Sequence, residues 1–147
     1  MLSINNPLNL RYSSHIQWQG QQGNCNGFVV FRSMFFGWLA ALKNARTKIR
    51  RCKSKTITIR DLITIWAPPI ENSTENYISF VCQFMNKLGF SVSDDTFFGE
   101  PENTESSKKF WISFFSAMYQ VENGVPLASN SFVSLIDALD TLVSIYK

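Results

Sequence analysis

An aromatic segment in the second half of this 147-residue sequence is its clearest structural signal. Residues 110–119 read Phe110-Trp111-Ile112-Ser113-Phe114-Phe115-Ser116-Ala117-Met118-Tyr119. The large side chains recur at three- and four-residue spacing, which places them on one face of an α-helix. The pattern predicts a packed helix from about residue 105 to residue 123, ended by Gly124, because glycine suits the backbone conformation of a helix C-terminus.

The same periodicity on either side predicts four more helices, at about residues 34–51, 58–66, 73–88 and 131–146. Their N-terminal signals are Ser33, Thr58 with Asp61, Asn72 or Ser73, and Asn130 or Ser131. A turn at Asn26-Gly27 leads into a short strand at 28–31, whereas 19–27 and 91–107 are expected to be loops. We therefore expect an α+β fold, mainly α, in a single domain spanning residues 1–147, with about five helices and a small N-terminal β-hairpin or sheet.

Composition excludes several classes of protein. Hydrophobic residues make up 45% and aromatic residues 14%, which is too much for a disordered chain. No apolar run reaches the roughly 18 residues of a transmembrane helix, so none is expected. The N-terminus, Met1–Asn6, lacks the basic and apolar regions of a signal peptide, so we expect synthesis in the cytoplasm without a secretion signal. Three widely spaced cysteines fit neither a disulfide framework nor a zinc site.

Charge divides the chain into two unequal parts. Residues 1–60 carry ten basic residues and no Asp or Glu, while residues 61–147 hold all 11 acids and four bases. Either the two parts neutralise each other within one domain, or the basic part faces a polyanion such as a cell wall or an anionic membrane. The basic segment 43–60 contains no aromatic residue to stack on bases, which disfavours nucleic acid as a partner.

Two glutamates are the candidates for acid–base chemistry. One histidine and the absence of metal-ligand or Gly-rich phosphate motifs predict neither a metal nor another cofactor. Glu71 follows a Pro-Pro turn near a helix N-terminus. The alternative to a catalytic role for Glu71 is that of a solvated acid stabilised by the helix dipole. Glu122 ends the aromatic helix, where aromatic neighbours would desolvate it and raise its pKa, as a general acid requires. An exposed terminal acid is the alternative for Glu122.

Three motifs lie between Asn5 and Gly124. They are Asn5-Asn6-Pro7-Leu8-Asn9-Leu10-Arg11, Trp66-Ala67-Pro68-Pro69-Ile70-Glu71-Asn72-Ser73-Thr74 and Glu122-Asn123-Gly124. Their order resembles that of a family of small phage and bacterial proteins often labelled virion structural proteins. Members of that family start Asn-Asn-Pro-Gly-Asn-Ile-Arg and end His-Glu-Asn-Gly. Here Leu8 replaces the glycine of the tight turn, and Val121 replaces the histidine, which removes a proton partner of the glutamate.

The first half also resembles, more loosely, a stretch of lysozyme-like glucosaminidases. The matching pieces are Asn5-Asn6, Trp18-Gln19-Gly20 and Phe28-Val29-Val30-Phe31. In those enzymes a catalytic glutamate lies on a helix before the Asn-Asn pair, and this chain begins almost at that pair. The resemblance implies a lysozyme-like domain whose acid comes from elsewhere, either Glu122 through a permuted helix order or Glu71.

These resemblances imply a peptidoglycan-degrading glycosidase or lytic transglycosylase, derived from a phage or delivered as an antibacterial effector. Glu122 or Glu71 would protonate the glycosidic oxygen, and the sugar-binding residues would be Asn5, Asn6, Arg11, Trp18, Trp66, Asn72, Thr74 and Tyr77. The implied partners are peptidoglycan glycan strands, with an immunity protein or a virion or secretion component as further candidates. The protein would act at the wall, in the periplasm or in a virion. The alternative is a non-enzymatic phage-type structural or wall-binding protein.

Overall fold

The computed structural model describes residues 4–67 and 73–145. Within these ranges it has five helices, α1 (Met34–Arg50), α2 (Ile59–Trp66), α3 (Thr74–Lys87), α4 (Glu105–Asn123) and α5 (Ser129–Ile145). Four short strands, β1 (Gln21–Cys25), β2 (Phe28–Phe31), β3 (Thr56–Thr58) and β4 (Phe97–Gly99), form two antiparallel pairs, β1–β2 and β3–β4. The predicted α+β, mainly α class is confirmed.

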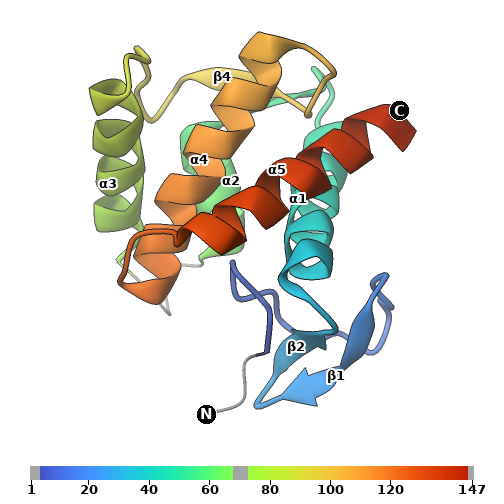
Figure 1. Cartoon of the computed structure of the whole chain (residues 1–147). Coiled ribbons are helices and arrows are strands. Elements are labelled where there is room, and N and C mark those ends of the chain that lie inside the picture. The colour runs from blue at the N-terminus through green and yellow to red at the C-terminus, as the bar shows by residue number, and fades with distance from the viewer. Residues whose placement is uncertain (1–3, 68–72, 146–147) are drawn as a thin grey trace.

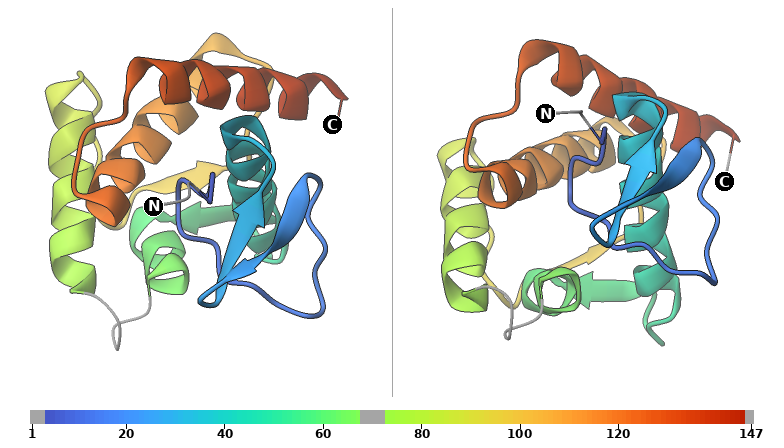
Figure 2. Two further views of the ribbon diagram at one scale, coloured as in Figure 1. Left: turned by 60° about the horizontal axis from the view of Figure 1, so that its bottom comes forward. Right: turned by 90° about the horizontal axis from the view of Figure 1, so that it is seen from below.

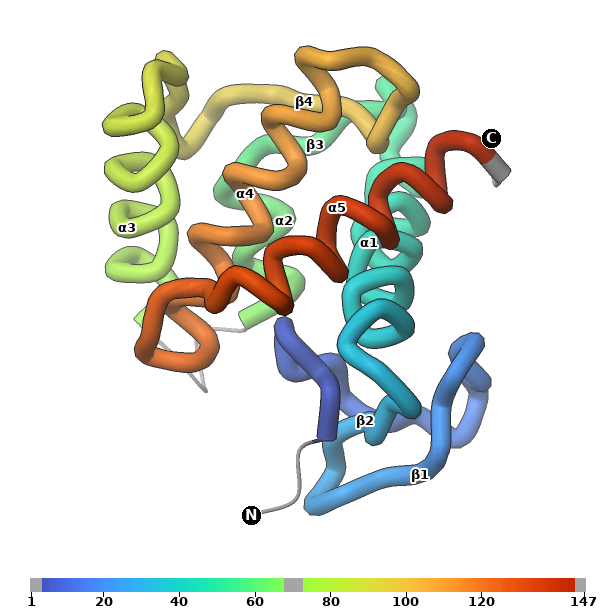
Figure 3. The backbone as a smooth tube through the Cα atoms, in the orientation of Figure 1, coloured from blue at the N-terminus to red at the C-terminus, as the bar shows by residue number. Residues whose placement is uncertain are grey.

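The helices pack around α4. In Figure 1, α5 crosses α1 and α4, and α3 flanks α4 on the outer side. The β1–β2 hairpin lies at the end of the molecule near the N-terminus, as the tube in Figure 3 also shows, and β3–β4 lies near the start of α4. Figure 2 shows the N-terminal segment running between the hairpin and the helices. Among the described residues, no helix has both the length and the apolar character needed to cross a membrane.

The aromatic face of α4 forms the centre of the core. The Phe115 ring centroid lies 6.1 Å from that of Trp38 on α1 and 6.0 Å from that of Trp66 on α2. Phe98 of β4 packs 5.2 Å from Phe114 in the same way. Trp38 and Phe115 are fully buried. The predicted helix therefore exists and connects α1, α2 and β4 through ring contacts.

Two expected loops are partly strands, and those two predictions were wrong. β1 lies within residues 19–27, and β4 lies within 91–107. β1 has little apolar character and pairs with β2 across the predicted Asn26-Gly27 turn, where both residues have positive φ. β4 pairs with β3, about 40 residues earlier, so the strand exists because its partner is placed beside it. Such short strands depend on pairing rather than on their own pattern.

Ion pairs join the basic and acidic parts of the chain. Arg50 binds Glu100 through two 2.8 Å hydrogen bonds, which lower the pKa of the Glu100 carboxyl. Arg60 donates to Asp94 at 2.9 Å and also binds Glu75. These contacts tie α1 to the segment after β4, and α2 to α3. The two parts of the chain therefore neutralise each other in part, as one of the two sequence interpretations proposed.

The first turn of α1 packs directly on the N-terminal segment at Gly37. A Cβ atom there would lie 2.1 Å from the carbonyl oxygen of Asn5 and 2.6 Å from Cδ of Pro7. Asn5 itself has a positive φ of 52°. Since no side chain fits between these backbones, a glycine is required at this helical position.

Gly37→Ala is therefore expected to destabilise the protein by about 1–3 kcal/mol through overpacking. In an ordinary helix interior the same change stabilises by roughly 1 kcal/mol, so the packing argument predicts the opposite sign. Urea unfolding measures the difference. Gly99→Ala is the matched control, because the nearest atom to its Cβ is 3.8 Å away, and its effect should stay within about 0.5 kcal/mol. A Gly37→Ala protein as stable as the wild type would contradict this packing.

Candidate functional site

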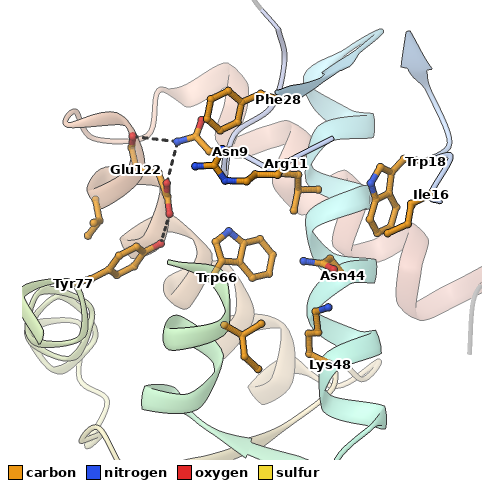
Figure 4. Close-up of a pocket in the computed structure, with 13 residues that line it drawn as sticks. Asn9, Arg11, Ile16, Trp18, Phe28, Asn44, Lys48, Trp66, Tyr77 and Glu122 are labelled. Atoms are coloured by element: carbon orange, nitrogen blue, oxygen red, sulfur yellow. Dashed lines mark hydrogen bonds between the residues drawn. The ribbon is translucent and has the colours of Figure 1, made fainter. Parts of the chain in front are cut away.

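A cleft of about 520 Å³ opens where segments from most of the chain meet (Figure 4). The segment before β1 contributes Asn9, Arg11, Ile16 and Trp18. The helices contribute Asn44 and Lys48 from α1, Ile65 and Trp66 from α2, Tyr77 from α3, and Val121 and Glu122 from α4. The cleft therefore combines apolar and aromatic surface with a few polar groups, as ligand sites generally do.

Glu122 is the acidic residue among the described residues that line the cleft. Its Oε1 accepts a hydrogen bond from Nδ2 of Asn9 and its Oε2 accepts one from the hydroxyl of Tyr77, both at 2.9 Å (Figure 4). Glu122 follows Phe115 by seven residues, or about two helical turns, so the two side chains share one face of α4. Burial of Phe115 in the core therefore directs Glu122 towards the cleft.

The surroundings of Glu122 differ from those expected of an isolated helix-terminal acid. The two donors stabilise the carboxylate and offset the unfavourable C-terminal pole of α4. Burial raises the pKa of Tyr77 well above its ordinary value, and the nearby Glu122 raises it further. Tyr77 is 2% exposed and stays protonated at neutral pH, so it remains a donor. The expectation that desolvation raises the pKa of Glu122 stays a prediction.

The turn at residues 5–10 is built on a buried asparagine. Nδ2 of Asn6 donates to the carbonyl oxygens of Leu10 at 2.9 Å and Val29 at 3.0 Å, and its Oδ1 accepts from the Leu10 amide. The turn forms with leucine at position 8, because the left-handed conformations fall on Asn5 and Asn9. Leu8 is fully buried, so it anchors the turn in the core.

The other two motifs hold this turn in place. Nε1 of Trp66 donates to the carbonyl oxygen of Leu8 at 2.9 Å. Nδ2 of Asn123 donates to the carbonyl oxygen of Pro7 at 2.9 Å. The three motifs therefore meet at one place, and their contacts bring Asn9 to Glu122 across 113 residues of sequence.

Four predicted sugar-binding residues line the cleft beside Glu122, namely Arg11, Trp18, Trp66 and Tyr77. Three others lie outside it. Asn5 donates to the carbonyl oxygen of Phe31, and the side chain of Asn6 donates to the carbonyl oxygen of Leu10 within the turn. The buried Thr74 donates to the carbonyl oxygen of Ala67. The remaining predicted sugar-binding residue, Asn72, and the second candidate acid, Glu71, fall outside the described residues.

Sequence reasoning did not single out Asn9, Asn44 and Lys48. Asn9 is part of the first motif, but only its contact with Glu122 shows why it matters. Lys48 is one of many bases in segment 43–60, and its position on the cleft depends on how α1 packs. In the described ranges, no group of three or more His, Cys, Asp or Glu side chains is placed to hold a metal ion.

The fold and site define a small, mainly helical α+β protein with a hydrogen-bonded carboxylate in a cleft that two indole rings line. No protein-family model matches the sequence. Over 127 residues the chain is 33% identical to "Protein P5" of Pseudoalteromonas phage PM2, an alignment that covers 84% of this chain and 70% of that protein. The chain belongs to the family of this phage protein, and the predicted relation to phage proteins is thereby confirmed.

The Tyr77–Glu122 contact predicts an unusual titration. In protein with ¹³C-labelled tyrosine, the Tyr77 signal, assigned through Tyr77→Phe, should remain in the phenol form past the ordinary tyrosine pKa of 10.0. Glu122→Gln removes the neighbouring charge and should lower the pKa of Tyr77. That value should nevertheless stay above 10.0, since burial is the larger cause. A Tyr77 signal that titrates at or below this value in the folded wild type would contradict the geometry.

Proposed function

We propose that this protein is a phage-type protein whose cleft binds the glycan strands of peptidoglycan. The observation that carries the proposal is the hydrogen-bonded carboxylate of Glu122 in a cleft lined by Trp18 and Trp66 (Figure 4). Indole faces pack on the apolar faces of sugar rings, while polar side chains bind hydroxyl and acetamido groups. The family relation supports a phage setting, in which a virion component or a protein released at lysis would reach the wall.

Trp18→Ala is expected to weaken co-sedimentation with purified sacculi by about tenfold, which corresponds to 1.4 kcal/mol and is typical of a lost aromatic anchor. Phe97→Ala is the matched control, because Phe97 is an aromatic residue 65% exposed on β4 and outside the cleft. Thermal unfolding of both variants shows whether the fold is retained. Equal binding by folded Trp18→Ala protein and wild type would argue against glycan binding in the cleft.

Cleavage of the bound strand is the second candidate function, and the place of the Glu122 carboxyl group in the cleft supports it. A protonated Glu122 would give its proton to the glycosidic oxygen as the bond from that oxygen to C1 breaks. Tyr77 and Asn9 would hold the carboxyl group in position. Where no second carboxylate directs a water molecule, the C6 hydroxyl of the same sugar would attack C1 and return its proton to Glu122. That route leaves a 1,6-anhydro end, whereas attack by water leaves a reducing end.

Mass spectrometry of sacculus digests tests cleavage separately from binding. The wild type is expected to release soluble fragments with anhydro ends, and Glu122→Gln to release them at least about a hundredfold more slowly, as loss of a general acid predicts. Glu102→Gln, at an exposed position outside the cleft, is the control for an unspecific loss of one carboxylate. A wild type that sediments with sacculi but releases nothing would leave a non-enzymatic wall-binding protein.

A further inference from the structure

The wall of the cleft formed by α1 is positively charged. Asn44 and Lys48 are one helical turn apart on α1, and both line the cleft. Figure 4 shows the Trp66 ring between this pair and Glu122. In the described part of the chain, Lys48 takes part in no ion pair. The ammonium group of Lys48 therefore faces the space that a ligand would occupy.

Among the described residues that line the cleft, none on this wall is an acid. Residues 1–60 contain no Asp or Glu, so neither α1 nor the segment before β1 can provide a carboxylate. Glu100 pairs with Arg50 at the C-terminal end of α1. A partly buried cation beside aromatic surface is most stable with an anionic partner. A negatively charged group on the ligand meets that requirement.

We propose that Lys48, together with Asn44, forms a subsite for a carboxylate carried by the bound glycan. This inference rests on the proposed glycan binding and specifies the substrate class as an anionic N-acetylated glycan, with a lactyl or peptide carboxylate, over a neutral one. The ammonium group binds the carboxylate by charge-assisted hydrogen bonds, and the Asn44 amide adds a neutral donor. Because Trp66 separates the subsite from Glu122, Lys48 determines which strand binds and takes no part in bond cleavage.

Two soluble probes of the same size test this subsite by titration calorimetry. The first is a tetrasaccharide of alternating N-acetylglucosamine and N-acetylmuramic acid with free lactyl carboxylates, and the second is its methyl ester. The wild type is expected to bind the carboxylate form about tenfold more tightly, the scale of one charge-assisted contact. Added salt should reduce that ratio, since it screens the interaction.

Lys48→Gln is expected to bring the ratio of the two affinities to about one, and Lys48→Arg to retain most of it, because the guanidinium keeps the charge. Lys53→Gln is the matched control, since it removes the same charge from an exposed position outside the cleft and should leave the ratio unchanged.

Three outcomes would overturn the inference. Equal wild-type affinity for the two probes would show that no carboxylate is recognised and would leave glycan binding intact. A ratio that falls as far in Lys53→Gln as in Lys48→Gln would assign the preference to overall charge. If the wild type binds neither probe and does not sediment with sacculi, the proposed function fails and this inference fails with it.

Discussion

Burial of the aromatic face of α4 is the interaction on which the rest of the structure depends. Phe115 packs against Trp38 and Trp66 and so fixes α1 and α2 relative to α4. Fully burying one such ring stabilises the fold by about 1.5–3 kcal/mol, whereas an exposed ion pair such as that of Arg60 is screened by solvent and contributes less. The aromatic core therefore sets the positions of the helices, and with them the walls of the cleft.

The polar turn at residues 5–10 converts this packing into a site. A turn pressed between helices must satisfy its backbone groups within the protein. Asn6, within the turn, donates to the carbonyl oxygen of Leu10. Trp66 on α2 and Asn123 on α4 donate to other carbonyl oxygens of the turn. The turn then presents Asn9 to Glu122, while Tyr77 reaches the same carboxylate from α3. Most motif side chains therefore form hydrogen bonds with the backbone of the turn. The elements that these bonds bring together then hold the Glu122 carboxylate.

The uneven charge of the chain has two consequences in the fold. Arg50 and Arg60 are neutralised by acids from the second part of the chain, which ties neighbouring elements together. The cleft receives cations from the acid-free first part, Arg11 and Lys48, opposite the single described acid of the second part. This arrangement supports the proposed preference for an anionic glycan.

The sequence by itself determined the helices, the turn at Asn26-Gly27 and the relation to phage proteins, because helical periodicity, capping residues and motifs are local patterns. It also narrowed the candidate acids to Glu122 and Glu71 without choosing between them. The sequence did not predict the strands β1 and β4, because each strand forms only beside its partner strand. Tertiary structure alone decided that Asn9 and Tyr77 meet Glu122, that Lys48 faces the cleft, and that Asn6 and Thr74 serve the backbone. These roles depend on contacts between residues that are far apart in the sequence, and only packing of the core brings such residues together.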